Sequence, residues 1–223
     1  MEHNNFSYII NLREIQRTLK AILPKETQFK IGKHSISFKL KEPFGIVSVN
    51  LLSAFEINDP EQIMQVRYKD SYYGSTSLLQ KKYFGNVVKD YPRFTDLVRL
   101  PKSWKNVNKI PLTSYMLELL VSYTIYKTPK DKNFQFFLER CFRTIQGFTD
   151  GRKIKPVYWE KQYTHSNINL KYSQNNMWLI DPSDPSENLV LKISKKEKDI
   201  IRSEAVNGIN HIKNNEYDFL LTR

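Results

Sequence analysis

The hydrophobic period of the chain changes once within its first 52 residues, from a helical to an alternating pattern. Residues 12–23 carry apolar side chains at the spacing of one helix face, and Pro24 ends that pattern. Apolar and polar residues then alternate over 29–31 and 35–40, and residues 46–52 form a short apolar run typical of a strand. One helix followed by three short strands predicts a small antiparallel sheet that packs on the helix.

The helical period dominates the rest of the chain. The predicted helices span residues 77–89, 94–100, 113–126 and 134–145. A capping box from Ser194 to Glu197 opens a last helix that reaches about residue 210. We therefore predict an α+β chain with a small α/β part at residues 1–60 and a mostly helical lobe at residues 61–223.

The composition favours a basic protein with a polyanionic partner. The 223 residues carry 35 Lys and Arg against 23 Asp and Glu, a net charge of +12. A genome biased toward Lys, Asn and Ile, including a viral one, explains the same excess equally well. No secretory signal is visible and no apolar stretch approaches the ~18 residues of a membrane span, so we expect a cytoplasmic protein without membrane contact.

The common catalytic and metal-binding motifs are absent. The phosphate loop, the dinucleotide-binding glycines and the H-E-x-x-H and G-x-S-x-G patterns do not occur, and the four histidines lack metal-ligand spacing. Cys141 is the single cysteine and lies on the apolar face of a predicted helix, which favours a buried thiol over a nucleophile. The most distinctive segment, D-P-S-D-P-S-E-N at 181–188, reads on its own as a rigid structural loop.

Four segments together resemble the second half of the 2′-5′-oligoadenylate synthetase family, part of the nucleotidyltransferase group that includes cyclic GMP-AMP synthases. They are V-N-L-L-S-A-F-E at 49–56, R-L-P-K-S-W at 99–104, S-Y-M-L-E-L-L at 114–120 and I-D-P-S-D-P-S-E-N at 180–188. Their order and approximate spacing hold from about residue 13 to about residue 210. The resemblance implies a sheet remnant of a nucleotidyltransferase core packed on a mostly helical C-terminal lobe.

The resemblance also implies that catalysis is lost. Family members hold two metal ions with a G-S loop, a D-x-D pair and a third Asp, because Mg²⁺ must neutralise a triphosphate and activate a ribose hydroxyl. We expect the first two elements to be missing from a truncated chain, and the third position falls on Asn50, whose neutral amide is no general base. Gly74 and Ser75 form a G-S pair with no D-x-D after it, which we interpret as a turn entering a helix. No metal or other cofactor is therefore expected, and Mg²⁺ with ATP would be used only if a partner chain supplied carboxylates.

The nucleotide-holding positions of the family are better kept. By resemblance, Lys102 contacts the triphosphate, Arg99 lies near a phosphate, and Ser114 and Tyr115 begin the next helix with a hydroxyl for phosphate and a ring that stacks on a base. The implied ATP binding is weak because no metal screens the triphosphate. The alternative is that Arg99 and Lys102 are solvated helix charges and that Tyr115 belongs to the core.

Family members also bind double-stranded RNA, mainly through phosphates and 2′-hydroxyls. The candidate cations of the first helix, at i, i+4 and i+7, are Arg13, Arg17 and Lys20. Those further along the chain are Lys81, Lys82, Lys89 and Arg93. An ordinary solvated surface explains the same pattern.

Three functions stay open at this point. The first is a silent pseudoenzyme that binds RNA or nucleotide and acts as a decoy or regulator of antiviral innate immune sensing. The second is a nucleotidyltransferase that makes 2′-5′-oligoadenylate from ATP once a partner chain supplies the missing carboxylates. The third is a protein-interaction module without a ligand. An uncovered sheet edge favours a protein partner or self-association.

Overall fold

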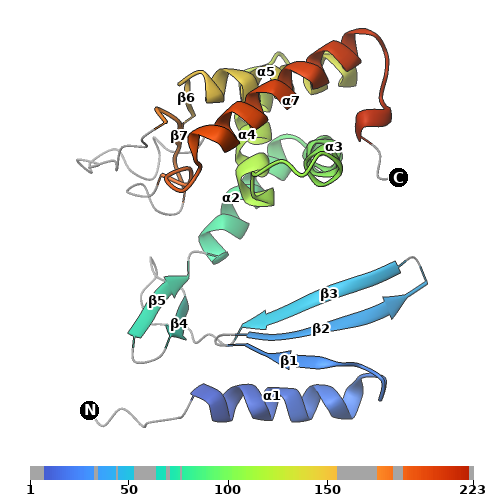
Figure 1. Ribbon diagram of the computed structural model, residues 1–223, viewed down its shortest axis with the longest axis vertical. Coiled ribbons are helices and arrows are strands. Elements are labelled where there is room, and N and C mark those ends of the chain that lie inside the picture. Colours follow the sequence, from blue (N-terminus) through green and yellow to red (C-terminus); the bar gives the residue numbers. More distant parts are fainter. Residues whose placement is uncertain are drawn as a thin grey trace. The chain divides into compact units, whose positions relative to one another are not determined.

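The computed structural model (Figure 1) describes residues 8–32, 35–43, 45–52, 64–68, 71–75, 77–154, 175–182 and 188–220. The chain forms two compact units, Met1–Leu78 and Leu79–Arg223, each of which is described by itself. Helices and strands together make the predicted α+β fold. The functional division after residue 60 stays a prediction. No helix in the described ranges is long and apolar enough to cross a membrane.

The first unit contains the predicted helix and three-stranded sheet. Its elements are helix α1 (Tyr8–Ile22) and strands β1 (Phe29–Ile31), β2 (Ser35–Glu42) and β3 (Gly45–Leu52). The sheet is antiparallel with the order β1-β2-β3. Ile36 and Phe38 are buried on one sheet face, where Ile15, Leu19 and Leu23 pack against them. The alternating pattern thus places its apolar half against α1, as predicted.

A second hairpin in this unit was not predicted. Strand β4 (Met64–Tyr68) pairs antiparallel with β5 (Ser71–Ser75). The alternation in β4 was a usable signal, but β5 contains adjacent tyrosines and a glycine and shows no period. The interpretation of Gly74 and Ser75 as a turn entering a helix is wrong, because both residues belong to β5 and pair with β4.

The second unit is mostly helical. Its elements are α2 (Ser77–Asp90), α3 (Phe94–Val107), α4 (Ser114–Tyr126), α5 (Phe134–Thr149), β6 (Lys153–Ile154), β7 (Trp178–Leu179), α7 (Lys195–Lys213) and the short 3₁₀ helix η1 (Asp218–Leu220). Every helix predicted for this part is confirmed. The end predicted for α3 near residue 100 is wrong, because the helix continues through Pro101 to Val107. Trp104 is fully buried one turn beyond the proline, so burial of its side chain offsets the lost backbone hydrogen bond.

Side-chain caps fix where three of these helices begin. Thr113 accepts a hydrogen bond from the Met116 N–H at 3.1 Å, and Asn133 accepts one from the Phe136 N–H at 2.8 Å. Ser194 forms the predicted capping box with its glutamate. These contacts satisfy backbone donors that have no partner within the helix.

The core of the helical unit is built on aromatic side chains. The rings of Trp104 and Phe142 meet edge to face at 5.0 Å. Helix α7 passes so close that a Cβ at Gly208 would lie 2.7 Å from the Phe142 ring. Cys141 is buried in the same core, and burial raises the pKa of this thiol to about 12. The prediction of a buried core thiol is thereby confirmed.

Replacing Gly208 by Ala is expected to destabilise the helical unit. A new methyl group would overlap the Phe142 ring at 2.7 Å, and such overpacking costs about 1–3 kcal/mol, more than the helix propensity it adds. Gly85→Ala is the matched control in α2, where a Cβ meets nothing within 4 Å. We expect it to raise the free energy of unfolding by about 0.5–1 kcal/mol. Urea unfolding of both variants tests this; equal effects of the two would contradict the packing argument.

Candidate functional site

The side of the three-stranded sheet away from α1 carries a polar, basic surface. Strand alternation and register place on it Lys30, Ser37, Lys39, Lys41, Ile46, Ser48 and Asn50. We call these residues the open sheet face. All but Ser37 are exposed, and Ile46 is the one apolar side chain among them. A hollow of about 760 Å³ adjoins these strands and the loop between α1 and β1.

Asn50 lies on β3, at one edge of this face, directly opposite Ser37 on β2. Lys30 on β1 pairs with the same serine, so the three residues form one row across the sheet. The face holds three lysines and no carboxylate, which suits phosphate oxygens better than a divalent cation. In the described parts of the chain, no three His, Cys, Asp or Glu side chains are grouped as metal ligands.

Helix α1 exposes the basic stripe expected of it. Arg13, Arg17 and Lys20 are exposed, whereas Ile15 and Leu19 of the same helix pack on the sheet. The stripe therefore faces solvent over about 10 Å of helix, since each residue adds 1.5 Å. The arrangement permits contact with successive phosphates, and the RNA-binding role of the stripe stays a prediction.

The other RNA candidates belong to the helical unit. Lys81, Lys82 and Lys89 are exposed on α2, whose buried side chains include Tyr83 and Val87. Their positions fit a solvated face and a phosphate-binding face equally well.

Arg93 is separate from these lysines, in the connection between α2 and α3. Its guanidinium lies over the Phe134 ring, 5.4 Å from the centroid. An aromatic side chain therefore holds this cation at the surface.

The structure brings two nucleotide candidates close to the start of α4. Lys102 of α3 forms an ion pair with Glu118 of α4, and Ser114, the exposed first residue of α4, lies one helical turn before that glutamate. Arg99 instead pairs with Asp96 on its own helix at 3.7 Å and is largely exposed. The partner Glu118 was not predicted, although it stands within the S-Y-M-L-E-L-L segment. The Glu118 carboxylate pairs with Lys102, the cation that the resemblance expects to bind phosphate.

Tyr115 connects α4 to the D-P-S-D-P-S-E-N segment. Its hydroxyl donates a hydrogen bond to Oδ1 of Asp181 at 2.8 Å, and Asp181 is 6% exposed. Its ring meets Phe84 edge to face at 5.9 Å and packs on the hydrophobic core. These contacts favour the core assignment for Tyr115, and base stacking by its ring stays a prediction.

Asn188 closes the other end of the same segment. The side chain is buried, its amide nitrogen donates to the Met177 carbonyl at 3.1 Å, and its oxygen accepts from the Leu179 N–H at 3.1 Å. Ile180 also bridges to Asn188. Both described ends of the segment therefore hold β7 and α4 in place, which supports the interpretation as a structural loop. Asp184 lies outside the described residues.

Comparison with known families agrees with these features. The family model for the C-terminal domain 2 of 2′-5′-oligoadenylate synthetase 1 matches residues 61–218. The chain belongs to this family, which confirms the resemblance found in the sequence segments. A search of curated proteins finds no match.

Solved structures of nucleotidyltransferase-like proteins share the fold. Two structures of CdnC from E. coli MS115-1 match with a TM-score of 0.74 and 18% identity, one in a complex with HORMA-deltaN and one with ATP. They cover 94% and 97% of this chain, which spans 65% and 69% of theirs. The CD-NTase CdnG of Bradyrhizobium diazoefficiens, in complex with GTP, matches with a TM-score of 0.62 and 11% identity, covering 96% of this chain and 69% of its own. At these identities the likeness concerns the fold alone.

We expect Tyr115→Phe to destabilise the helical unit. The change removes the hydrogen bond to the buried carboxylate of Asp181, and bonds to charged groups contribute about 1.5–3 kcal/mol. Tyr123→Phe on the same helix is the control, because the Tyr123 hydroxyl makes no hydrogen bond with the described residues. Thermal and urea unfolding should separate the two variants. Equal stabilities would show that the bond to Asp181 contributes nothing.

Proposed function

We propose that this chain is a catalytically silent member of the 2′-5′-oligoadenylate synthetase family that binds double-stranded RNA. The observation that carries the proposal is the open sheet face, where a neutral Asn50 stands among Lys30, Lys39 and Lys41. Two-metal catalysis needs converging carboxylates that hold Mg²⁺. Lysines repel such ions and attract phosphates, so the same surface disfavours synthesis and favours a polyanion.

A silent relative with a basic surface suits a regulatory role. Double-stranded RNA is bound mainly through its backbone, so a copy that keeps exposed cations competes with an active enzyme for the same RNA. We propose that the protein acts in this way in the cytoplasm, as a decoy or regulator of antiviral sensing. The net charge of +12 and the exposed stripe on α1 support this proposal.

The first expected outcome is that the chain alone makes no 2′-5′-oligoadenylate. Incubation with ATP, Mg²⁺ and double-stranded RNA, followed by chromatography, should give no product. Asn50→Asp should not restore synthesis, because one carboxylate among three lysines does not make a two-metal site. Product in excess of the protein concentration, from either the parent or the variant, would overturn the proposed silence.

A second candidate function is nucleotide transfer completed by a partner chain. The specific observation is the likeness to CdnC, whose structure was solved in complex with HORMA-deltaN. The same Mg²⁺-dependent assay, run with and without each candidate partner, tests it. Product that appears only with the partner would replace the decoy proposal, whereas binding without product would favour an interaction module.

The second expected outcome concerns RNA. Affinity for a double-stranded RNA should fall about 10³–10⁵-fold between about 50 and 200 mM salt if 6–10 phosphates are contacted. Arg17→Glu with Lys20→Glu should weaken all RNA sequences alike, because no base is read. Fluorescence anisotropy over a salt series measures both effects.

The control for this charge reversal has the same net charge as the α1 variant. Lys192→Glu with Lys213→Glu removes two exposed lysines outside the candidate surfaces. If this control weakens RNA binding as much as the α1 variant does, the overall charge binds RNA and the stripe has no special role.

The third expected outcome concerns ATP, which we propose binds weakly beside Lys102 and Ser114. The structures of CdnC with ATP and CdnG with GTP support nucleotide binding in this fold. The start of α4 offers the positive end of a helix dipole, which favours phosphate. We expect a dissociation constant on the order of 1 mM.

The ion pair with Glu118 provides the test of this site. Phosphate must compete with the Glu118 carboxylate for Lys102, so Glu118→Gln should strengthen ATP binding and Lys102→Ala should abolish it. Ligand-detected NMR is suited to millimolar affinities. Unchanged binding in both variants would remove Lys102 from the nucleotide site.

A further inference from the structure

Two apolar hollows lie on either side of Phe134 in the helical unit. The first, about 240 Å³, is formed by the connection between α2 and α3 and by the start of α5. The second, about 230 Å³, is lined by Leu100, Leu138, Tyr217 and Leu220, with Phe134 as the shared wall. We call the two hollows together the Phe134 groove. A cavity of about 150 Å³ is enough to bind benzene, so each hollow accommodates one large apolar side chain.

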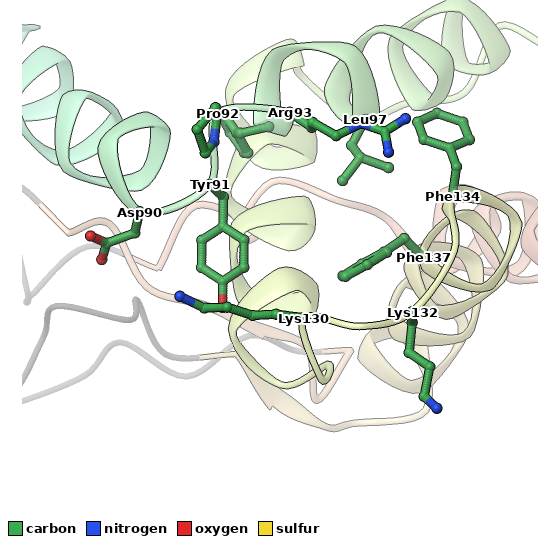
Figure 2. Close-up of a pocket in the computed structure, with 10 residues that line it drawn as sticks. Asp90, Tyr91, Pro92, Arg93, Leu97, Lys130, Lys132, Phe134 and Phe137 are labelled. Carbon is green, nitrogen blue, oxygen red and sulfur yellow. The ribbon is translucent and has the colours of Figure 1, made fainter.

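Figure 2 shows how the walls of the first hollow are arranged. The Tyr91 ring stands on one side, Phe134 and Phe137 stand on the other, and Leu97 reaches in between them. The facing surfaces are ring and aliphatic carbons. A nucleobase would bury its polar edges here without hydrogen-bond partners, which is costly. An aliphatic or aromatic side chain has no such edges, so the interior favours a peptide over a nucleotide.

Two cations stand at the rim of the first hollow. The Arg93 guanidinium lies over Phe134 at 5.4 Å, and the Lys130 ammonium lies over Tyr91 at 5.0 Å. Neither pairs with a carboxylate of the described residues. Both side chains are exposed, so the rim presents two positive charges to an approaching partner.

The other charged residues around the first hollow are directed elsewhere. The Asp90 carboxylate accepts a hydrogen bond from the Tyr126 hydroxyl at 2.6 Å and points away from the hollow in Figure 2. The Lys132 ammonium lies 5.9 Å from the Phe136 ring centroid and 3.6 Å from Asp131. The charge that faces a ligand is therefore positive.

We propose that the Phe134 groove binds an acidic peptide segment of a partner protein. One apolar side chain of the segment enters each hollow, on opposite sides of Phe134, and flanking carboxylates pair with Arg93 and Lys130. Paired apolar anchors with a charged rim are a recurring mode of peptide recognition. This inference goes beyond the proposed RNA binding, and it assigns Arg93 to a protein contact.

The probe is a set of fluorescent acidic peptides, each with two leucines whose spacing varies across the set from adjacent positions to one full helical turn. We expect at least one peptide to bind the full chain with a dissociation constant of about 10–100 μM. Replacing its leucines by alanine should abolish binding. Arg93→Glu with Lys130→Glu should weaken it at least about 10-fold, because like charges then meet across the interface.

Two control variants keep the test specific. Peptide affinity should be unchanged by Phe136→Ala, at an exposed residue beside the groove. It should also be unchanged by Arg17→Glu with Lys20→Glu, which lie in the other unit. The proposal is overturned if no peptide binds at about 1 mM, a concentration at which a binding free energy of about −4 kcal/mol is detectable. It is also overturned if the Arg93 and Lys130 reversal has no effect, or if single-stranded RNA binds this surface and responds to that reversal while the peptides do not bind. A failure of RNA binding at the α1 stripe would not affect the proposal that the Phe134 groove binds a peptide.

Discussion

The contact between the Phe142 ring and the bare backbone of Gly208 lets the rest of the helical unit assemble. Around the same ring, Trp104 of α3 packs edge to face at 5.0 Å and Phe219 of η1 packs at 5.7 Å. One aromatic side chain of α5 therefore fixes α3, α7 and the C-terminal turn together, and interiors this dense tolerate little displacement. The positions of Lys102 on α3 and of the Phe134 groove at the start of α5 follow from that packing.

The order of elements could be predicted because the hydrophobic period changes with the secondary structure. The period of residues 12–23 and the alternation of residues 35–40 each match one buried face. The failures have physical causes. Strand β5 has no alternating pattern and acquires its conformation by pairing with β4. Helix α3 continues through Pro101 because the burial of Trp104 outweighs the local stop signal of the proline. The sequence around Pro101 does not reveal how deeply Trp104 is buried.

The candidate site was only partly accessible from the sequence, because a motif names residues and leaves out their partners. Lys102 stands 16 residues from Glu118, and Tyr115 stands 66 residues from Asp181, so both contacts depend on how helices pack. The open sheet face is different. Lys39 and Lys41 alternate with apolar residues in the same strand, so a basic face opposite α1 follows from period two alone.

The residues that mark the family and the position that the resemblance assigns to a catalytic carboxylate lie in different parts of the chain. The family model matches residues 61–218, a range that contains Asp181 and Asn188 but not Asn50. Asp181 accepts a hydrogen bond from α4, and Asn188 holds β7, so both residues serve the fold whether or not the protein is an enzyme. Losing either buried hydrogen bond would destabilise the fold. The position that the resemblance assigns to the third carboxylate lies outside the matched range, on the open sheet face, which presents an amide and three lysines.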